Sequence, residues 1–294
     1  MRDAPILRAV EFAALWPLRK LLRALPHGAS RALGGWLGEL AHAFDSSGRA
    51  TARENVAGAY PELDPSERAR IARAGFRHFG AAFFDALSAV RFDRVELCHR
   101  VTIVGLEHLV AAEAGGRGVV LLTARLGNWE IVPLAISLAR GPVALIHRPV
   151  DDPHVDRELC ALHDRFGNRM LDERGAVREL FRVLRAKGLV GLLVEQGVRA
   201  EEAIEVPFLG RPARTRPIVA RLALESGAPV VLVFAGPLPG GRYRVEFHPA
   251  IEPGGPDDEA NTLELTRRCL EACERVIRRS PEHWLWFQGR RRRG

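Results

Sequence analysis

The sequence predicts an α/β fold, in which helices cover a mostly parallel sheet and a helical N-terminal extension precedes the sheet. Three observations lead to this class. From Val101 onward, short β-branched runs alternate with longer amphipathic segments. From Pro26 to Arg94 the pattern is helical. The 294 residues are 47% hydrophobic, with no internal repeat and no linker that would divide the core, so a single domain is expected.

Residues 1–30 have the character of a membrane-associated anchor helix. The window from Ile6 to Leu25 carries five charged residues, each costing roughly 2.5 to 3.5 kcal/mol at the centre of a spanning helix, so crossing the membrane is disfavoured. Most apolar residues share one side of the helical wheel, which is typical of a helix lying in the membrane interface. A helix packed on the domain is the alternative. No signal peptide is present, so we expect the protein to stay inside the cell.

Residues 31–294 are predicted to form a single α/β domain, of which residues 31–100 are a helical lead-in. Within it, Asp64-Pro65-Ser66-Glu67 resembles a capping box and predicts a helix that continues through Phe79. Strands are expected at Gly118 to Thr123, Val143 to His147, Leu189 to Val194, Val230 to Phe234 and Tyr243 to Phe247. Helices are expected at Trp129 to Leu138, Asp156 to Phe166, Gly175 to Lys187, Pro217 to Ser226 and Glu259 to Arg279.

The formal net charge of +7 favours anionic partners such as lipid headgroups, phosphates or an acidic carrier protein. Because almost every basic residue is an arginine, only clusters and motif positions are informative. The run from Arg290 to Arg293 is such a cluster, either a solvated tail or a contact with an anionic membrane surface.

The four cysteines follow no disulfide or zinc pattern, and Cys269 and Cys273 are expected in the core. We expect neither a metal nor a cofactor.

The stretch from Gly118 to Glu130 reads as a strand, a tight turn and a helix. The strand ends at Thr123, the turn includes Gly127, and the helix is expected to begin near Asn128. The turn side chains therefore lie at the carboxyl end of a strand, where ligand sites of α/β proteins form, and helix amides there can hold an anion. Ordinary strand-turn-helix joints look similar, so this geometry alone is a weak signal.

A second stretch delivers an acid at the end of another buried strand. Glu195 is followed by Gln196, a glycine and Arg199, and then by the loop from Val206 to Thr215. Thr215 is the expected N-cap of the next helix. An acid and several arginines in loops suit a phosphorylated or anionic headgroup, whereas a surface ion-pair network is the alternative.

Six segments in a fixed order give the chain a family resemblance. They are Asn55 to Glu62, Ala124 to Glu130, His147 to Pro153 with Arg165 to Arg169, Glu195-Gln196, Pro207 to Ala213, and Trp284 to Trp286. From about residue 5 to residue 293, the sequence resembles the late acyltransferases of lipid A biosynthesis, the lauroyl and myristoyl transferases of the lysophospholipid acyltransferase superfamily.

This resemblance implies a three-layer α/β/α acyltransferase fold with an N-terminal anchor on the cytoplasmic face of the cell inner membrane. It implies an acyl carrier protein thioester as the donor and a lipid A precursor or related anionic glycolipid as the acceptor. Nucleic acid is not an expected partner.

The resemblance also assigns site residues. Family members carry a histidine, four intervening residues and an acid, in which the histidine takes the proton of the acceptor hydroxyl and the acid orients the imidazole. Here the acid is Glu130, and the chain reads Arg-Leu-Gly-Asn-Trp-Glu where the family reads His-Phe-Gly-Asn-Trp-Glu. Arg125 therefore occupies the position of the base. An arginine cannot act as a base, because its pKa above about 12 keeps it protonated.

The remaining matched positions imply binding roles. The resemblance places Asn128 at the thioester, Arg148 and Arg165 at a phosphate or the acyl carrier, and Glu195 at the acceptor headgroup. Arg199 is expected at the same headgroup because of its charge and its place in the loop after Glu195. Trp284 and Trp286 are expected as core or interface aromatics.

Three interpretations of Arg125 stay open at this point. In the first, it is a substitution in an otherwise intact enzyme. In the second, Arg125 is paired to Glu130 and holds a phosphate or the thioester oxygen, and another group is the base: His147 or His163 among the histidines, or Glu195 if burial raises its pKa. In the third, catalysis is lost and the protein binds lipid or carrier without turnover. A hydrolase is disfavoured because the chain has no Gly-x-Ser-x-Gly nucleophile motif.

Overall fold

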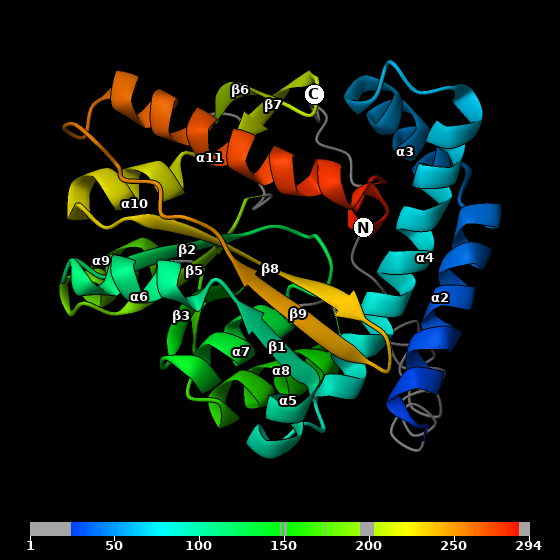
Figure 1. Cartoon of the computed structure of the whole chain (residues 1–294), viewed down its shortest axis with the longest axis horizontal. Coiled ribbons are helices and arrows are strands. Elements are labelled where there is room, and N and C mark those ends of the chain that lie inside the picture. The colour runs from blue at the N-terminus through cyan, green and yellow to red at the C-terminus, as the bar shows by residue number, and fades with distance from the viewer. Residues whose placement is uncertain (1–24, 148, 150–151, 174, 195–202, 288–294) are drawn as a thin grey trace.

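The computed structural model describes residues 25–147, 149, 152–173, 175–194 and 203–287 (Figure 1). The described helices are α2 His27–Phe44, α3 Ser46–Ala59, α4 Pro65–Ala89, α5 Arg94–Arg100, α6 Leu106–Ala114, α7 Ile131–Ala139, α8 Pro153–Arg165, α9 Ala176–Arg185, α10 Ile218–Ser226, α11 Glu259–Arg279 and the 3-10 helix η2 Pro281–His283. The strands are β1 Val101–Val104, β2 Val119–Thr123, β3 Val143–His147, β4 Arg169–Asp172, β5 Leu189–Leu193, β6 Ile204–Phe208, β7 Arg211–Thr215, β8 Val230–Leu238 and β9 Arg242–Phe247.

Seven strands form one sheet in the order β1-β9-β8-β2-β5-β3-β4. Every neighbouring pair is parallel except β8 and β9, which are antiparallel. The central strands are buried on both faces, which is why β2 and β5 read as continuous apolar runs. The carboxyl ends of β2, β5 and β3 therefore meet at one edge of the sheet, and this edge carries the site described below.

Helices cover both faces of the sheet, so the domain has three layers (Figure 1). Successive residues of β2 point to opposite faces: Leu121 belongs to a core shared with α5 to α8, and Leu122 to a core shared with α9, α10 and α11. The predicted α/β/α class with a mostly parallel sheet is confirmed.

The N-terminal helices α2 and α4 pack against one another beside the end of the sheet (Figure 1). The predicted cap of α4 is confirmed, because the Asp64 carboxylate accepts hydrogen bonds from the Ser66 and Glu67 amides, although the helix continues beyond Phe79 to Ala89. Trp36, Leu40 and Phe44 recur at helical spacing on α2 and are exposed. None of the described helices combines the length and apolar character needed to span a membrane. Most of the predicted anchor lies outside the described residues.

The five strands and five helices expected after Val101 are all present, with ends that shift by a few residues. Two short strands at the sheet edges, β1 and β4, were not predicted. The segment from Val206 to Thr215 is not the expected loop but most of the antiparallel hairpin of β6 and β7. Thr215, predicted as an N-cap, is the last residue of β7, and Pro217 precedes α10 instead. Cys269 and Cys273 are buried in α11, as expected.

Candidate active site

The turn between β2 and α7 brings the predicted motif to the carboxyl edge of the sheet. Gly127 has a φ of 65°, and a Cβ there would lie 2.0 Å from the Ala235 carbonyl oxygen, so only glycine fits. The Gly127 backbone N–H donates to the His283 carbonyl oxygen, and the Asn128 backbone N–H donates to the Ala235 carbonyl oxygen. A turn closed by the Ile131 amide on the Asn128 carbonyl oxygen follows, and α7 begins at Ile131 rather than near Asn128.

The Glu130 carboxylate lies at the start of α7 between two donors. Trp129 Nε1–H donates to Oε1 over 2.8 Å, and His163 Nε2 lies 3.4 Å from Oε2. Burial raises the pKa of Glu130, but the hydrogen bonds from His163 and Trp129 act in the opposite direction, and the net pKa is lowered. Glu130 is therefore an ionised carboxylate at neutral pH.

Buried amides fix the orientation and tautomer of His163. The Val143 backbone N–H can only donate, and it bonds the Asn168 side-chain oxygen over 2.9 Å. The Asn168 NH₂ group therefore faces His163 Nδ1, at 3.4 Å, and Nδ1 must accept. The ring proton is then on Nε2, which donates to Glu130. The His163 side chain is only 1% exposed, and both of its ring nitrogens form hydrogen bonds within the protein.

Asn128 is held from the other side by the N-terminal helices. Its Nδ2 donates to Asp85 Oδ2 over 3.3 Å, and the same oxygen accepts from Arg31 Nη1 over 2.9 Å. Asp85 is fully buried on α4, and its other oxygen lies 2.8 Å from His27 Nε2. A buried carboxylate needs such partners, so this network ties α2 and α4 to the turn.

His78 of α4 fixes the turn itself. Its Nε2–H donates to the Gly127 carbonyl oxygen over 3.2 Å, and its ring lies 4.6 Å from that of His283. Burial, with a smaller contribution from His283, lowers the pKa of His78 to about 3. The His78 ring is therefore neutral under ordinary conditions and acts as a hydrogen-bond donor.

An apolar cavity of about 660 Å³ opens beside this turn. Arg125, Asn128, Glu130, His147 and His163 border it on the side of the sheet edge. Its walls, which lie between the sheet and α7 and α8, include Leu121, Val132, Ile136, Val143, Leu145, Gly191 and Val233. A cavity with apolar walls and a few convergent polar groups is typical of a site for a ligand with an apolar chain and a polar head.

Thr123 adds an unsatisfied polar group to the cavity. Its hydroxyl oxygen is buried and has no hydrogen-bond partner among the residues that the structure describes. A buried hydroxyl without a partner costs about 1–3 kcal/mol, so a polar atom of a ligand or a water is expected to satisfy it.

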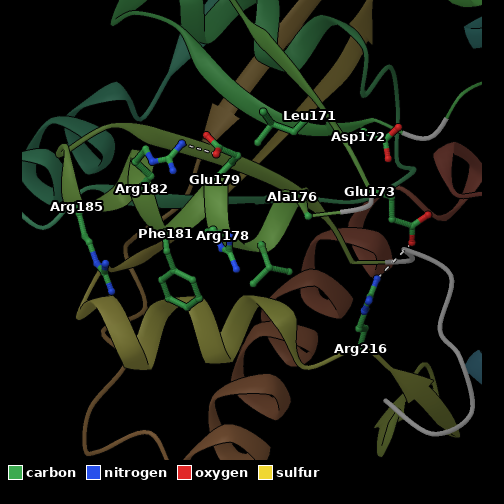
Figure 2. Close-up of a pocket in the computed structure, with 12 residues that line it drawn as sticks. Leu171, Asp172, Glu173, Ala176, Arg178, Glu179, Phe181, Arg182, Arg185 and Arg216 are labelled. Atoms are coloured by element: carbon green, nitrogen blue, oxygen red, sulfur yellow. Dashed lines mark hydrogen bonds and ion pairs between the residues drawn. The ribbon is translucent and has the colours of Figure 1, made fainter.

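An open groove of about 1290 Å³ runs along α9, and we call it the α9 groove (Figure 2). It is lined by Arg178, Arg182, Arg185 and Arg216, with Asp172, Glu173 and Glu179 as the acids and Val177 and Phe181 among the apolar residues. Figure 2 shows Phe181 directed toward α10, with Arg178 and Arg185 on either side of it. Glu173 also borders the apolar cavity, so the two features adjoin.

The structure brings together three of the predicted site residues, Arg125, Asn128 and Glu130. Arg165 is not among the residues that line the cavity; its guanidinium donates to the carbonyl oxygens of Phe92 and Val90. Arg148, Glu195, Arg199 and the basic run from Arg290 lie outside the described residues. Trp284 and Trp286 are buried in the core.

Asp85 and Asn168 are among the polar residues that support the site and were not predicted. Asp85 interrupts an apolar stretch of α4, and an acid in such a stretch is a signal of a buried partner. Asn168 is part of the Arg165 to Arg169 segment, but its orientation toward His163 is set by the Val143 amide at the start of β3, a contact that the sequence does not reveal.

Comparisons with known proteins identify the family of the chain. Residues 7–293 match the family model described as bacterial lipid A biosynthesis acyltransferase. A lipid A biosynthesis acyltransferase of Haemophilus influenzae is 26% identical and covers 87% of this chain and 78% of that protein. A phosphatidylinositol mannoside acyltransferase of Mycolicibacterium smegmatis is 24% identical, over 87% of this chain and 84% of that protein. The lipid A biosynthesis lauroyltransferase of Escherichia coli is 23% identical, over 92% and 87%.

A solved structure of a 1-acyl-sn-glycerophosphate acyltransferase from Thermotoga maritima aligns with 84% of this chain and 98% of that one, at 12% identity. The TM-score of this alignment is 0.38. The family match extends over nearly the whole chain, and it includes the segment from Arg125 to Glu130 that borders the apolar cavity. The chain is an acyltransferase that belongs to the bacterial lipid A biosynthesis acyltransferase family.

Proposed function

We propose that the protein transfers a fatty acyl chain from an acyl carrier protein to a hydroxyl of a lipid A precursor or a related anionic glycolipid. The observation that carries this proposal is the apolar cavity that opens beside Glu130 at the carboxyl edge of the sheet. An acyl chain fits its apolar walls, and the thioester then lies near the polar groups at the edge. The relatives are named for lipid A and for phosphatidylinositol mannoside, which are both glycolipids.

In this proposal Arg125 takes the position where the family motif has histidine. Its guanidinium is always protonated and cannot remove a proton. It can donate hydrogen bonds to the oxyanion that forms when a hydroxyl attacks the thioester carbon, which is a large source of stabilisation in acyl transfer. Arg125 is thus assigned to the donor carbonyl rather than to the acceptor hydroxyl.

The α9 groove supports an acidic carrier protein as the donor. Arginine and apolar side chains share α9, and Arg178 has no acidic partner among the described residues. Such a surface suits a partner that presents carboxylates around an apolar contact. Arg178→Glu should raise KM for the carrier thioester severalfold and leave KM for the matching coenzyme A thioester unchanged. Equal effects on both donors would contradict docking in this groove.

The exposed face of α2 supports association with a membrane surface, which we place on the cytoplasmic side of the inner membrane. Trp36 is 59% exposed and Phe44 is 81% exposed, and both lie on the same side of α2 as Leu40. Aromatic and apolar side chains in this arrangement partition into the membrane interface. Trp36→Ser with Phe44→Ser should weaken flotation with anionic vesicles; unchanged flotation would remove this support.

The transferase proposal is tested by product formation. Purified full-length protein is incubated with acyl carrier thioester and a lipid A precursor in detergent micelles, and the mass of the acceptor is then measured by mass spectrometry. We expect one added acyl chain, and a higher rate for Arg125→His because that side chain can act as a base. No product from either protein with several glycolipid acceptors would refute acyl transfer and favour a lipid-binding protein.

A further inference from the structure

His147 ends β3 at the edge of the apolar cavity. β3 and β2 are separated only by β5, so their backbones are about 10 Å apart. Leu145 pairs with Gly191 and Thr123 pairs with Leu193, which sets His147 level with Thr123. Alternate side chains of a strand share a face, and Val143, Leu145 and His147 all line the cavity.

The His147 ring is oriented by α8. Its Nε2 lies 2.9 Å from Asp156 Oδ1 and 3.6 Å from Cys160 Sγ. Asp156 and Cys160 are four residues apart, so they present the carboxylate and the thiol from one face of the helix. The carboxylate can only accept, so the ring proton is on Nε2 and the lone pair is on Nδ1. An acid that orients an imidazole in this way leaves the far nitrogen able to take a proton.

Of the described histidines, His147 and His163 border the cavity. His163 accepts from Asn168 at Nδ1 and donates to Glu130 at Nε2, so neither nitrogen is left for a substrate. Both contacts of His147 are made by Nε2, and the described residues offer no partner to its Nδ1. His147 therefore has the nitrogen that a general base needs, on the cavity that also contains Arg125.

We propose that His147 is the general base of this enzyme, in place of the missing histidine at position 125. This inference rests on the proposed acyl transfer. The acceptor hydroxyl loses its proton to His147 Nδ1 as its oxygen bonds to the thioester carbon, and Arg125 donates to the carbonyl oxygen. The carbon–sulfur bond then breaks, and the proton passes from Nδ1 to the leaving thiolate. An ester and a free thiol are the products.

Glu130 supports this step by its charge. Its ionised carboxylate borders the same cavity as His147, and this negative charge stabilises the positive charge that develops on the imidazole during the reaction. Glu130 is thus a positioning and charge-stabilising residue rather than the partner of a histidine at position 125.

The test is a two-by-two set of variants: the native chain, His147→Gln, Arg125→His and the double variant. We expect His147→Gln to lower kcat roughly 100-fold to 10,000-fold, which is the usual contribution of a general base. In the Arg125→His background the same substitution should have little effect, because the new histidine supplies a base. His154→Gln, a histidine of α8 that does not line the cavity, is the matched control and should leave kcat unchanged.

Chemical rescue separates a base from a structural residue. Imidazole added to His147→Gly should restore part of kcat, whereas a packing defect would not respond. If the native chain is active and His147→Gln has the same kcat, the inference is overturned. Activity found only in the Arg125→His variants would also overturn it. The latter result would leave the proposed function intact, and product from none of the four proteins would refute the proposed function itself.

A metal ion is the competing use of the same side chains. The ligand atoms of His147, Asp156 and Cys160 lie within 4.8 Å of one another, a set that could hold zinc. If His147 acts as a base without a metal ion, the native chain should keep its activity in the presence of a chelator. Loss of activity with EDTA and its return with zinc would overturn that assignment.

Discussion

Gly191 of β5 should set the length of the acyl chain that the enzyme prefers. A Cβ at this position would lie 2.5 Å from Leu145 Cδ2 and 3.2 Å from Val143 Cγ1, and both side chains line the apolar cavity. In Gly191→Ala the end of Leu145 must therefore shift within the cavity. The fold should tolerate this, because the closest atom is the flexible end of a side chain rather than backbone.

The expected magnitude follows from the volume that the new methyl and the displaced Leu145 take from the ligand, which is about one or two methylene groups. Each buried methylene contributes roughly 0.8 kcal/mol. The ratio of kcat/KM for the longest accepted donor to that for a donor two carbons shorter should fall about 4-fold to 15-fold.

The assay is competition among saturated acyl carrier thioesters that differ by two carbons, with products separated by mass spectrometry. Gly236→Ala of β8 is the matched control, because a Cβ there meets nothing within 4 Å and the position does not line the cavity. An unchanged chain-length ratio in a folded Gly191→Ala protein would show that the cavity does not hold the acyl chain.

Three further predictions concern the groups around the turn. The pKa of His78 is lowered to about 3 in the folded protein. Below about pH 6.5 the unfolded state therefore binds a proton that the folded state does not. This group alone lowers the free energy of unfolding by roughly 1.4 kcal/mol for each pH unit of acidification. His78→Gln should reduce that slope between pH 6.5 and 4 in urea titrations; identical slopes would contradict the burial argument. Asp85→Ala leaves the charge of Arg31 without its buried partner and should cost about 3 kcal/mol by urea unfolding, whereas a loss below about 1 kcal/mol would contradict the network. Asn168→Ala removes the donor that sets the His163 tautomer, and should lower kcat more than its loss of about 1–3 kcal/mol in stability explains; full activity would contradict the relay.

The sequence predicted the central strands well because they are buried on both faces. Such strands are continuous apolar runs, and β3 has the expected bounds from Val143 to His147. The missed strands lack this signal. β4 is a short edge strand with a charged residue at each end, and Pro207 and Pro212 sit opposite each other in the hairpin of β6 and β7. Proline lowers strand propensity, so the sequence pattern there indicated a loop.

The motif around Glu130 was predictable because its residues are contiguous in the sequence. The partners of the motif could not be predicted, because they lie far away along the chain. His163 is 33 positions away and reaches Glu130 only through the packing of α8 on the sheet. Asp85 contacts Asn128 across 43 positions. For His147 the sequence indicated the end of a strand, but its choice over His163 as the base required the contacts of both ring nitrogens.

The most direct test of acyl transfer at this site is the turnover of Glu130→Gln. The native chain and Glu252→Gln, a surface control that pairs with Arg117, are assayed beside it with acyl carrier thioester and a lipid A precursor. We predict acylated glycolipid from the native and control proteins, and a rate roughly 100-fold lower for folded Glu130→Gln, because the substitution removes a fixed charge that stabilises the reaction. Equal rates for all three proteins, or no acylated product from any of them, would contradict acyl transfer at the site that contains Glu130.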